Sequence, residues 1–155
     1  MFRFALVLIM SLAVSSHAVA AGAPFKKATI AYEKGDYSAA FCIFTSLAEK
    51  GDMVAQFNLA KMYREGKGVS KNHKTAVNWF GLSAEQGNTF AQHHLSLLYY
   101  FGNGVPQNSA YAYMWANQAS ANGFEMAGQL HQVLAEQMTP SQIDEAISLA
   151  KSMQR

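Results

Sequence analysis

The chain has 155 residues, of which 50% are hydrophobic and 12% aromatic, so it is long enough to bury a core without disulfides or metal. This composition excludes an intrinsically disordered chain, which would be poor in both kinds of residue. The formal net charge of +2 excludes an arginine-rich nucleic-acid binder, and we therefore predict no nucleic-acid partner.

The first twenty residues have the layout of a secretory signal peptide. Arg3 supplies a positive charge, an apolar run follows over residues 4–14, and Ala18-Val19-Ala20 offers small residues to a signal peptidase. The run is shorter than the about 20 residues that span a bilayer, which disfavours the alternative of a retained membrane anchor. We predict a signal peptide over 1–20, cleavage after Ala20, no stable membrane insertion of the mature chain 21–155, and a periplasmic or secreted location.

A period of 36 residues organises the mature chain. Glycine recurs at positions 51, 87 and 123, and the same spacing relates Trp79 to Trp115 and Tyr63 to Tyr99. It also relates the glycine loop 66–69 to the loop 102–105. A repeat of this length indicates a solenoid of supersecondary units.

Each unit is predicted to be a pair of helices. Gly87 favours the left-handed conformation that ends a helix, and Asn88 can cap the next one. Sustained alternation of the kind found in strands is absent. One side of the first helix of the second unit carries the spacing of a buried stripe, formed by Ala76, Trp79, Phe80, Ser83 and Ala84.

The segments 84–88, 91–95, 99–108 and 112–115 together resemble the Sel1-like (Sel-one-like) repeat, a relative of the tetratricopeptide repeat. Two copies are clear, at about 51–86 and 87–122. A degenerate unit precedes them and another follows them. The resemblance implies an all-α fold, namely a right-handed α–α superhelix of antiparallel helix pairs. The unit after Gly123 departs from the pattern, with Gly128 in place of the glutamine and His131 in place of the leucine.

The last predicted helix carries the signals of a cap. Thr139 can cap its N-terminus, Pro140 suits the first helical position, and Gln142 stands three residues after the cap. Ile143 and Ala146 begin an apolar stripe that continues through Ile147 and Ala150. We expect this C-terminal capping helix to close the apolar end of the stack.

Few residue patterns point to chemistry. The Gly66 and Gly102 loops lack the preceding strand and the Lys-Ser/Thr pair of a phosphate loop, so they are interpreted as turns. His93 and His94 are adjacent, and on a regular helix they point about 100° apart, which does not suit one metal. Carboxylates able to pair as in a hydrolase are Glu85, Glu125, Glu136 and Asp144, for which charged helix surfaces are the simpler interpretation. We predict no catalytic residue, cofactor or metal.

The concave face of the solenoid is the expected binding surface, because the first helix of each unit presents equivalent positions there. Its candidate binding residues are Cys42, Lys74, Asn78, Met114 and Asn117. Cys42 is the only cysteine, so the chain forms no internal disulfide. Two interpretations of Cys42 remain open: a small buried side chain in contact with the next unit, or an accessible thiol able to form a mixed disulfide.

The resemblance implies a non-catalytic adaptor that binds another protein or peptide. The alternative is an envelope enzyme or a protein directed at peptidoglycan. A third possibility is self-association, because Tyr100, Phe101 and Phe124 place aromatic groups near the unit boundaries.

Overall fold

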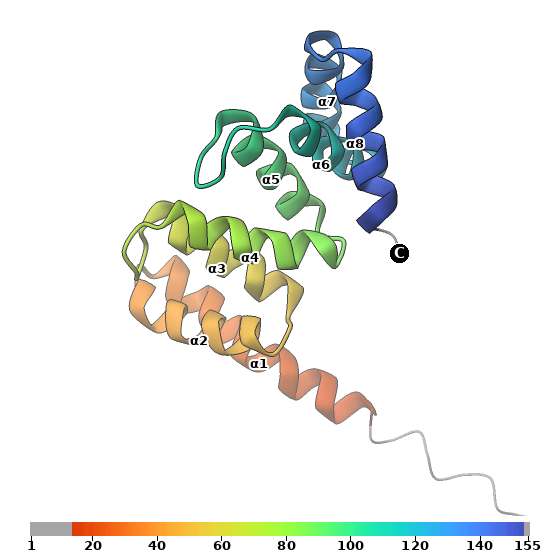
Figure 1. Ribbon diagram of the computed structural model, residues 1–155. Helices are drawn as coiled ribbons and strands as arrows, with labels where there is room; N and C mark the ends of the chain where they lie inside the picture. Colours follow the sequence, from red (N-terminus) through yellow and green to blue (C-terminus); the bar gives the residue numbers. More distant parts are fainter. Residues whose placement is uncertain (1–13, 154–155) are drawn as a thin grey trace, which may run out of the picture.

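The computed structural model describes residues 14–153, and this part of the chain contains helices and no strands. The apolar run of the expected signal peptide falls on residues that lie, except for Val14, outside the described part. Figure 1 shows the helices stacked from α1 at one end to α7 and α8 at the other, an α–α superhelix as expected. The helices are α1 (Val14–Glu33), α2 (Tyr37–Glu49), α3 (Met53–Glu65), α4 (His73–Glu85), α5 (Thr89–Phe101), α6 (Ser109–Ala121), α7 (Glu125–Gln137) and α8 (Pro140–Met153).

The helices alternate between two roles along the stack. We call α2, α4 and α6 the A helices and α3, α5 and α7 the B helices. Each A helix leads into its B helix through a short glycine turn, in which Gly51 and Gly87 have φ of 90° and 97°. Asn88 then accepts a hydrogen bond from the Ala91 backbone N–H at 3.1 Å. The predicted helix end and the predicted cap are therefore confirmed.

The core is built from the apolar stripe that the sequence predicts. Ala76, Phe80 and Ala84 are at most 1% exposed. Ser83 in the same stripe is also buried, and its hydroxyl donates to the Met53 carbonyl oxygen at 2.7 Å. Trp79 is half-buried and packs against two hydrophobic clusters, one around α2 and α3 and one around α4 and α5. Small and large side chains thus alternate along one continuous interior.

The longer loops between the repeats fit against the preceding A helix. Gly68 lies against the backbone of Tyr37 at the start of α2, and Gly104 lies in the same way against His73 at the start of α4. Both glycines have positive φ, of 72° and 80°. These loops therefore pack back on the A helix of the pair that they leave, which supports their interpretation as turns.

The C-terminal helix α8 begins with the expected cap. The Gln142 side chain accepts from the Thr139 backbone N–H at 2.9 Å, and the Thr139 hydroxyl accepts from the Gln142 N–H at 3.4 Å. The helix caps the core by packing against α6, two positions back in the chain. On α7, Gln132 and Glu136 are exposed at register positions where α5 carries the buried or half-buried Ser96 and Tyr100. The stack therefore ends in a polar face of α7, while α8 covers one side of α6.

Candidate functional site

Four of the five residues expected on the binding face are exposed: Cys42, Lys74, Asn78 and Asn117. The interpretation of Cys42 as a buried side chain is therefore wrong, and its thiol is accessible in the fold. Met114 is only 2% exposed and belongs to the core, so the expectation that it points outward needs correction. The reason is α8, whose Leu149 and Ala150 pack against the cluster that contains Met114.

A groove runs between the A helices α4 and α6. It contains one hollow of about 570 Å³ and a second of about 370 Å³, and Met153, the last described residue of α8, lines both. Both are lined by Glu85, Trp115 and Met153, so we treat them as one site and call it the α4–α6 groove. Its larger hollow is lined by Val77, Asn78, Gly81, Leu82, Glu85, Leu95, Tyr99, Tyr111, Trp115 and Met153. Of the predicted face, only Asn78 lies in this groove.

Aromatic side chains form much of the groove wall. The rings of Tyr99 on α5 and Tyr111 on α6 stack at 4.9 Å with an interplanar angle of 18°. Burial, with a smaller contribution from Tyr111, raises the pKa of Tyr99 and keeps its hydroxyl protonated. Trp115 is 4% exposed and fixed in the core. These rigid rings offer apolar contact area with little loss of side-chain entropy on binding.

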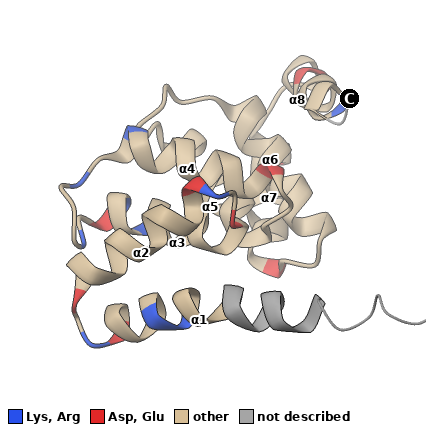
Figure 2. Ribbon diagram, turned by 90° about the horizontal axis from the view of Figure 1, so that it is seen from below, with Lys and Arg blue, Asp and Glu red and all other residues tan. Residues whose placement is uncertain are grey.

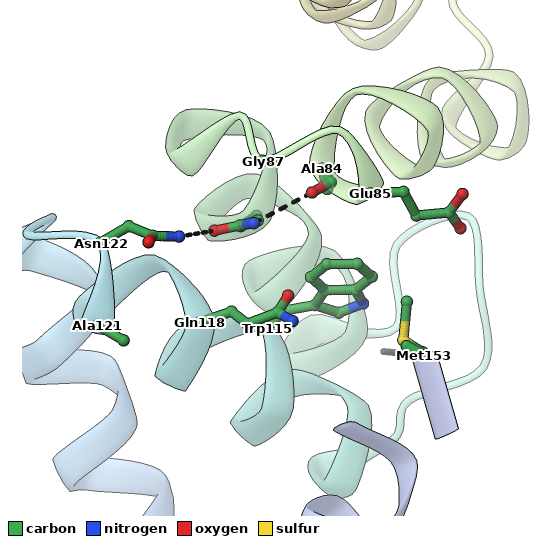
Figure 3. A pocket seen from close by; sticks show the side chains of 9 residues that line it. Ala84, Glu85, Gly87, Trp115, Gln118, Ala121, Asn122 and Met153 are labelled. Atoms are coloured by element: carbon green, nitrogen blue, oxygen red, sulfur yellow. Dashed lines mark hydrogen bonds between the residues drawn. The ribbon is translucent and has the colours of Figure 1, made fainter. Parts of the chain in front are cut away.

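The smaller hollow is polar at its far end (Figure 3). Gln92 donates to the Ala84 carbonyl oxygen at 3.1 Å, and the Asn122 side-chain amide donates to Gln92 at 3.4 Å. Gln118 lies beside Trp115 on the same helix, and Glu85 is the charged residue of the lining. The groove therefore combines an apolar wall with a hydrogen-bonding end.

The buried glutamines have a structural role that sequence reasoning missed. One repeat earlier, Gln56 donates to the Ala48 carbonyl oxygen at 3.2 Å and accepts from Gln86 at 2.7 Å. In both repeats the glutamine thus adds a side-chain donor to a carbonyl at the end of the A helix, which also accepts from the backbone N–H of the turn glycine, Gly51 or Gly87. The 36-residue spacing of Gln56 and Gln92 was the signal that could have identified this role.

The B helices carry a second exposed apolar surface. Val54, Phe90 and Met126 occupy equivalent positions in α3, α5 and α7, and they are 42%, 55% and 60% exposed. Next to this surface, Arg64 donates to the Nδ1 of His94 at 3.0 Å. Desolvation by burial, assisted by the nearby Arg64 charge, lowers the pKa of His94 to about 4.

The other residues considered for chemistry are dispersed. His93 is buried, with its pKa lowered by desolvation, while His73 and His131 are half-buried in other helices. Within residues 14–153, no group of three His, Cys, Asp or Glu side chains is placed to hold a metal ion. Of the carboxylates considered above, Glu85 alone lines the α4–α6 groove. No helix in the same range is long and apolar enough to cross a membrane.

The fold defines a helical-repeat protein with a groove between two of its A helices. The model of the Sel1 repeat matches residues 54–88 and 89–124, so the chain carries two Sel1 repeats. These matches start within three residues of the two clear repeats predicted from the glycine register. Proteins with this fold generally serve as protein-interaction adaptors and are typically non-catalytic scaffolds.

Two solved structures show the same architecture. The chain is similar to a protective antigen with an SLR fold present in uropathogenic Escherichia coli strains, with 30% identity over 86% of this chain and a TM-score of 0.79. It is also similar to a Sel1 repeat protein from Oxalobacter formigenes, with 35% identity over 59% of this chain and a TM-score of 0.58. The chain spans 29% and 26% of the length of these two proteins. Among curated protein sequences, none matches significantly.

Proposed function

We propose that this protein is a non-catalytic adaptor, exported to the bacterial periplasm or beyond, and that its α4–α6 groove binds a segment of another protein. The observation that carries the proposal is the groove itself. Asn78 and Leu82 are exposed on α4, and they face a wall that includes the stacked rings of Tyr99 and Tyr111. A hollow of about 570 Å³ is within the size range of ligand sites and suits one or two large apolar side chains.

The sparse charge of the protein indicates how the partner is recognised. Charged residues make up 14% of the chain, and most positions along the described helices carry neither Lys or Arg nor Asp or Glu (Figure 2). Electrostatic steering therefore contributes little, and shape, apolar contact and hydrogen bonds to groups such as Asn78 and Gln118 supply the specificity.

Site-specific photocrosslinking tests the binding face. A photoreactive residue at Asn78 is expected to give one discrete protein adduct in an envelope extract. The same residue at Phe90, on the exposed surface of the B helices, is the matched control. Adducts from Phe90 and none from Asn78 would place the binding face on the B helices and contradict the proposal.

The proposal of export rests on the layout of residues 1–20 and is supported by the position of Pro24. This residue lies inside α1 as the helix runs back to Val14. In a mature chain that begins at Ala21, Pro24 stands in the first helical turn, where the backbone N–H groups have no helical partner. N-terminal sequencing of protein from the periplasmic fraction is expected to begin at Ala21. Protein that begins at Met1 would contradict cleavage.

A further inference from the structure

The C-terminal helix α8 covers a surface that the repeat pattern leaves open elsewhere. Lys74 and Asn78 of α4 are exposed, and their equivalents in α6 are Ala110 and Met114. These two are only 4% and 2% exposed. The change from polar to apolar residues at these positions matches the presence of α8 on α6. The concave face of α6 is thus a surface that already accepts a helix.

The contacts that hold α8 there are apolar. Ala146 is 1% exposed, and Ile143, Leu149 and Ala150 pack against the clusters that contain Ala110 and Met114. The side-chain hydrogen bonds of α8 stay within its own segment, as in the bond from Ser152 to the Leu149 carbonyl. Within residues 14–153, no ion pair or side-chain hydrogen bond ties α8 to another helix.

The attachment of α8 to the fold is also narrow. Consecutive helices from α1 to α7 pack against one another, whereas the main neighbour of α8 is α6 alone. Only Met138 and Thr139 separate α8 from α7. Because few contacts must break, α8 can detach while the repeats keep their own core. At its end, Met153 lines both hollows of the α4–α6 groove, so its departure would widen both.

We propose that α8 is a displaceable occupant of the concave face, and that the partner of this face is an amphipathic helix that takes the place of α8. The proposal deepens the adaptor function and rests on it. The apolar spacing of α8 defines the partner helix. That helix should carry apolar side chains at the positions equivalent to Ile143, Ala146, Leu149 or Ala150, and Met153. Glu85 lines the same hollow as Met153, so a basic residue near the C-terminal end of the partner helix would be favoured by this carboxylate and by the negative end of its own helix dipole.

Competition follows from this arrangement. While α8 covers α6 the face is closed, so the apparent affinity for a partner helix is the intrinsic affinity multiplied by the fraction of molecules in which α8 is detached. A change that detaches α8 is therefore expected to strengthen binding of a helix in trans.

A labelled peptide of residues 139–155 serves as the probe, with fluorescence anisotropy as the measurement on the full mature chain. Ala146→Glu in the protein places a charge at a buried apolar contact and is expected to detach α8. This variant should bind the wild-type peptide at least ten-fold more tightly than the wild-type protein does. Ser148→Glu, on the exposed side of α8, is the matched control and should behave as wild type. A peptide that itself carries Ala146→Glu should bind neither protein.

Equal binding of the peptide to the wild-type and Ala146→Glu proteins, or no binding to either, would overturn the proposal. If Ala146→Glu does not fold, native-state hydrogen exchange of the wild-type protein tests the proposal independently. Amides of α8 should exchange at least ten-fold faster than those of α6, and equal protection of the two helices would show that α8 is an integral part of the core. Loss of this proposal alone leaves crosslinking at Asn78 intact, whereas failure of the adaptor function removes those crosslinks.

Discussion

Arg64 on α3 donates a hydrogen bond from Nη1 to Nδ1 of His94 on α5, at 3.0 Å, and so joins two successive B helices. The bond requires that Nδ1 of His94 carries no proton, because both ring nitrogens of an imidazolium are donors and neither can accept. Phe57 and Phe80 enclose the ring, with centroids at 5.7 and 5.1 Å. An apolar enclosure and a cationic neighbour both oppose protonation, which makes this contact sensitive to pH.

Stability is expected to fall as the pH drops from about 6.5 to about 4. Desolvation, Arg64, His93 and Lys61 lower the pKa of His94 to about 4 from 6.5, and Glu65 opposes them. In this window the unfolded chain binds a proton that the folded chain does not, so stability is complete above pH 6.5 and decreases below it. At about 1.4 kcal/mol per unit, the expected loss is roughly 2–3 kcal/mol by pH 4.

Urea unfolding of the wild type and of His94→Gln between pH 7 and pH 4 measures this loss. The buried His93 and the half-buried His131 also have lowered pKa values and give both proteins some slope. The variant should lose less stability per pH unit than the wild type, and the difference between the two proteins gives the contribution of His94. Identical slopes would show that His94 is protonated as readily in the fold as in the unfolded chain.

Phe80→Ala is expected to destabilise the protein by roughly 3–5 kcal/mol, because it opens a cavity at a fully buried site. Leu82→Ala, two residues later on the same helix, is the control. Leu82 is 46% exposed, and its truncation should cost less than about 1 kcal/mol. Chemical denaturation of both variants tests the assignment of the core stripe. Comparable losses in the free energy of unfolding would contradict that assignment.

Gly104→Ala is expected to cost more than Gly35→Ala, although both glycines have φ of 80°. The left-handed conformation alone costs an alanine roughly 1–2 kcal/mol at either position. A Cβ at Gly104 would also lie 2.6 Å from the carbonyl oxygen of His73, whereas nothing lies within 4 Å at Gly35. Thermal unfolding of the two variants compares them, and equal midpoints would mean that the 102–108 loop does not touch α4.

Cys42 is expected to react with a thiol-specific reagent in the folded protein, because its side chain is exposed on α2. Mass spectrometry after a short alkylation without denaturant should show one added group, and Cys42→Ser should show none. If labelling requires denaturant, Cys42 is covered in solution, either by the fold or by a second molecule.

The repeating part of the fold could be predicted from the sequence because each repeat carries its own local signals. Gly87 and Asn88 fix the turn between α4 and α5 through backbone conformation and capping, which depend only on neighbouring residues. The apolar stripe with Ala76 and Phe80 follows from helical spacing alone.

The position of α8 could not be predicted in the same way. The cap at Thr139 is local and was confirmed, but the choice of α6 as the neighbour of α8 depends on tertiary packing. The burial of Met114 follows from that choice, and so does the difference between Trp115, which is 4% exposed, and the half-buried Trp79 one repeat earlier. The groove contains Asn78 from the predicted face, but its aromatic wall comes from pairs such as Tyr99 and Tyr111, which only the fold brings together.

The two-residue connection through Met138 and Thr139 sets a limit on how this protein can be lengthened. The B helices α3 and α5 reach the next A helix through longer glycine loops, 66–72 and 102–108, that lock onto the preceding repeat. No such loop follows α7, and its outer side offers the exposed Gln132 and Glu136. Further helix pairs can therefore be inserted between existing copies, where both joining surfaces are present, whereas a pair appended after Gln137 would lack the glycine loop and would meet Gln132 and Glu136 on α7.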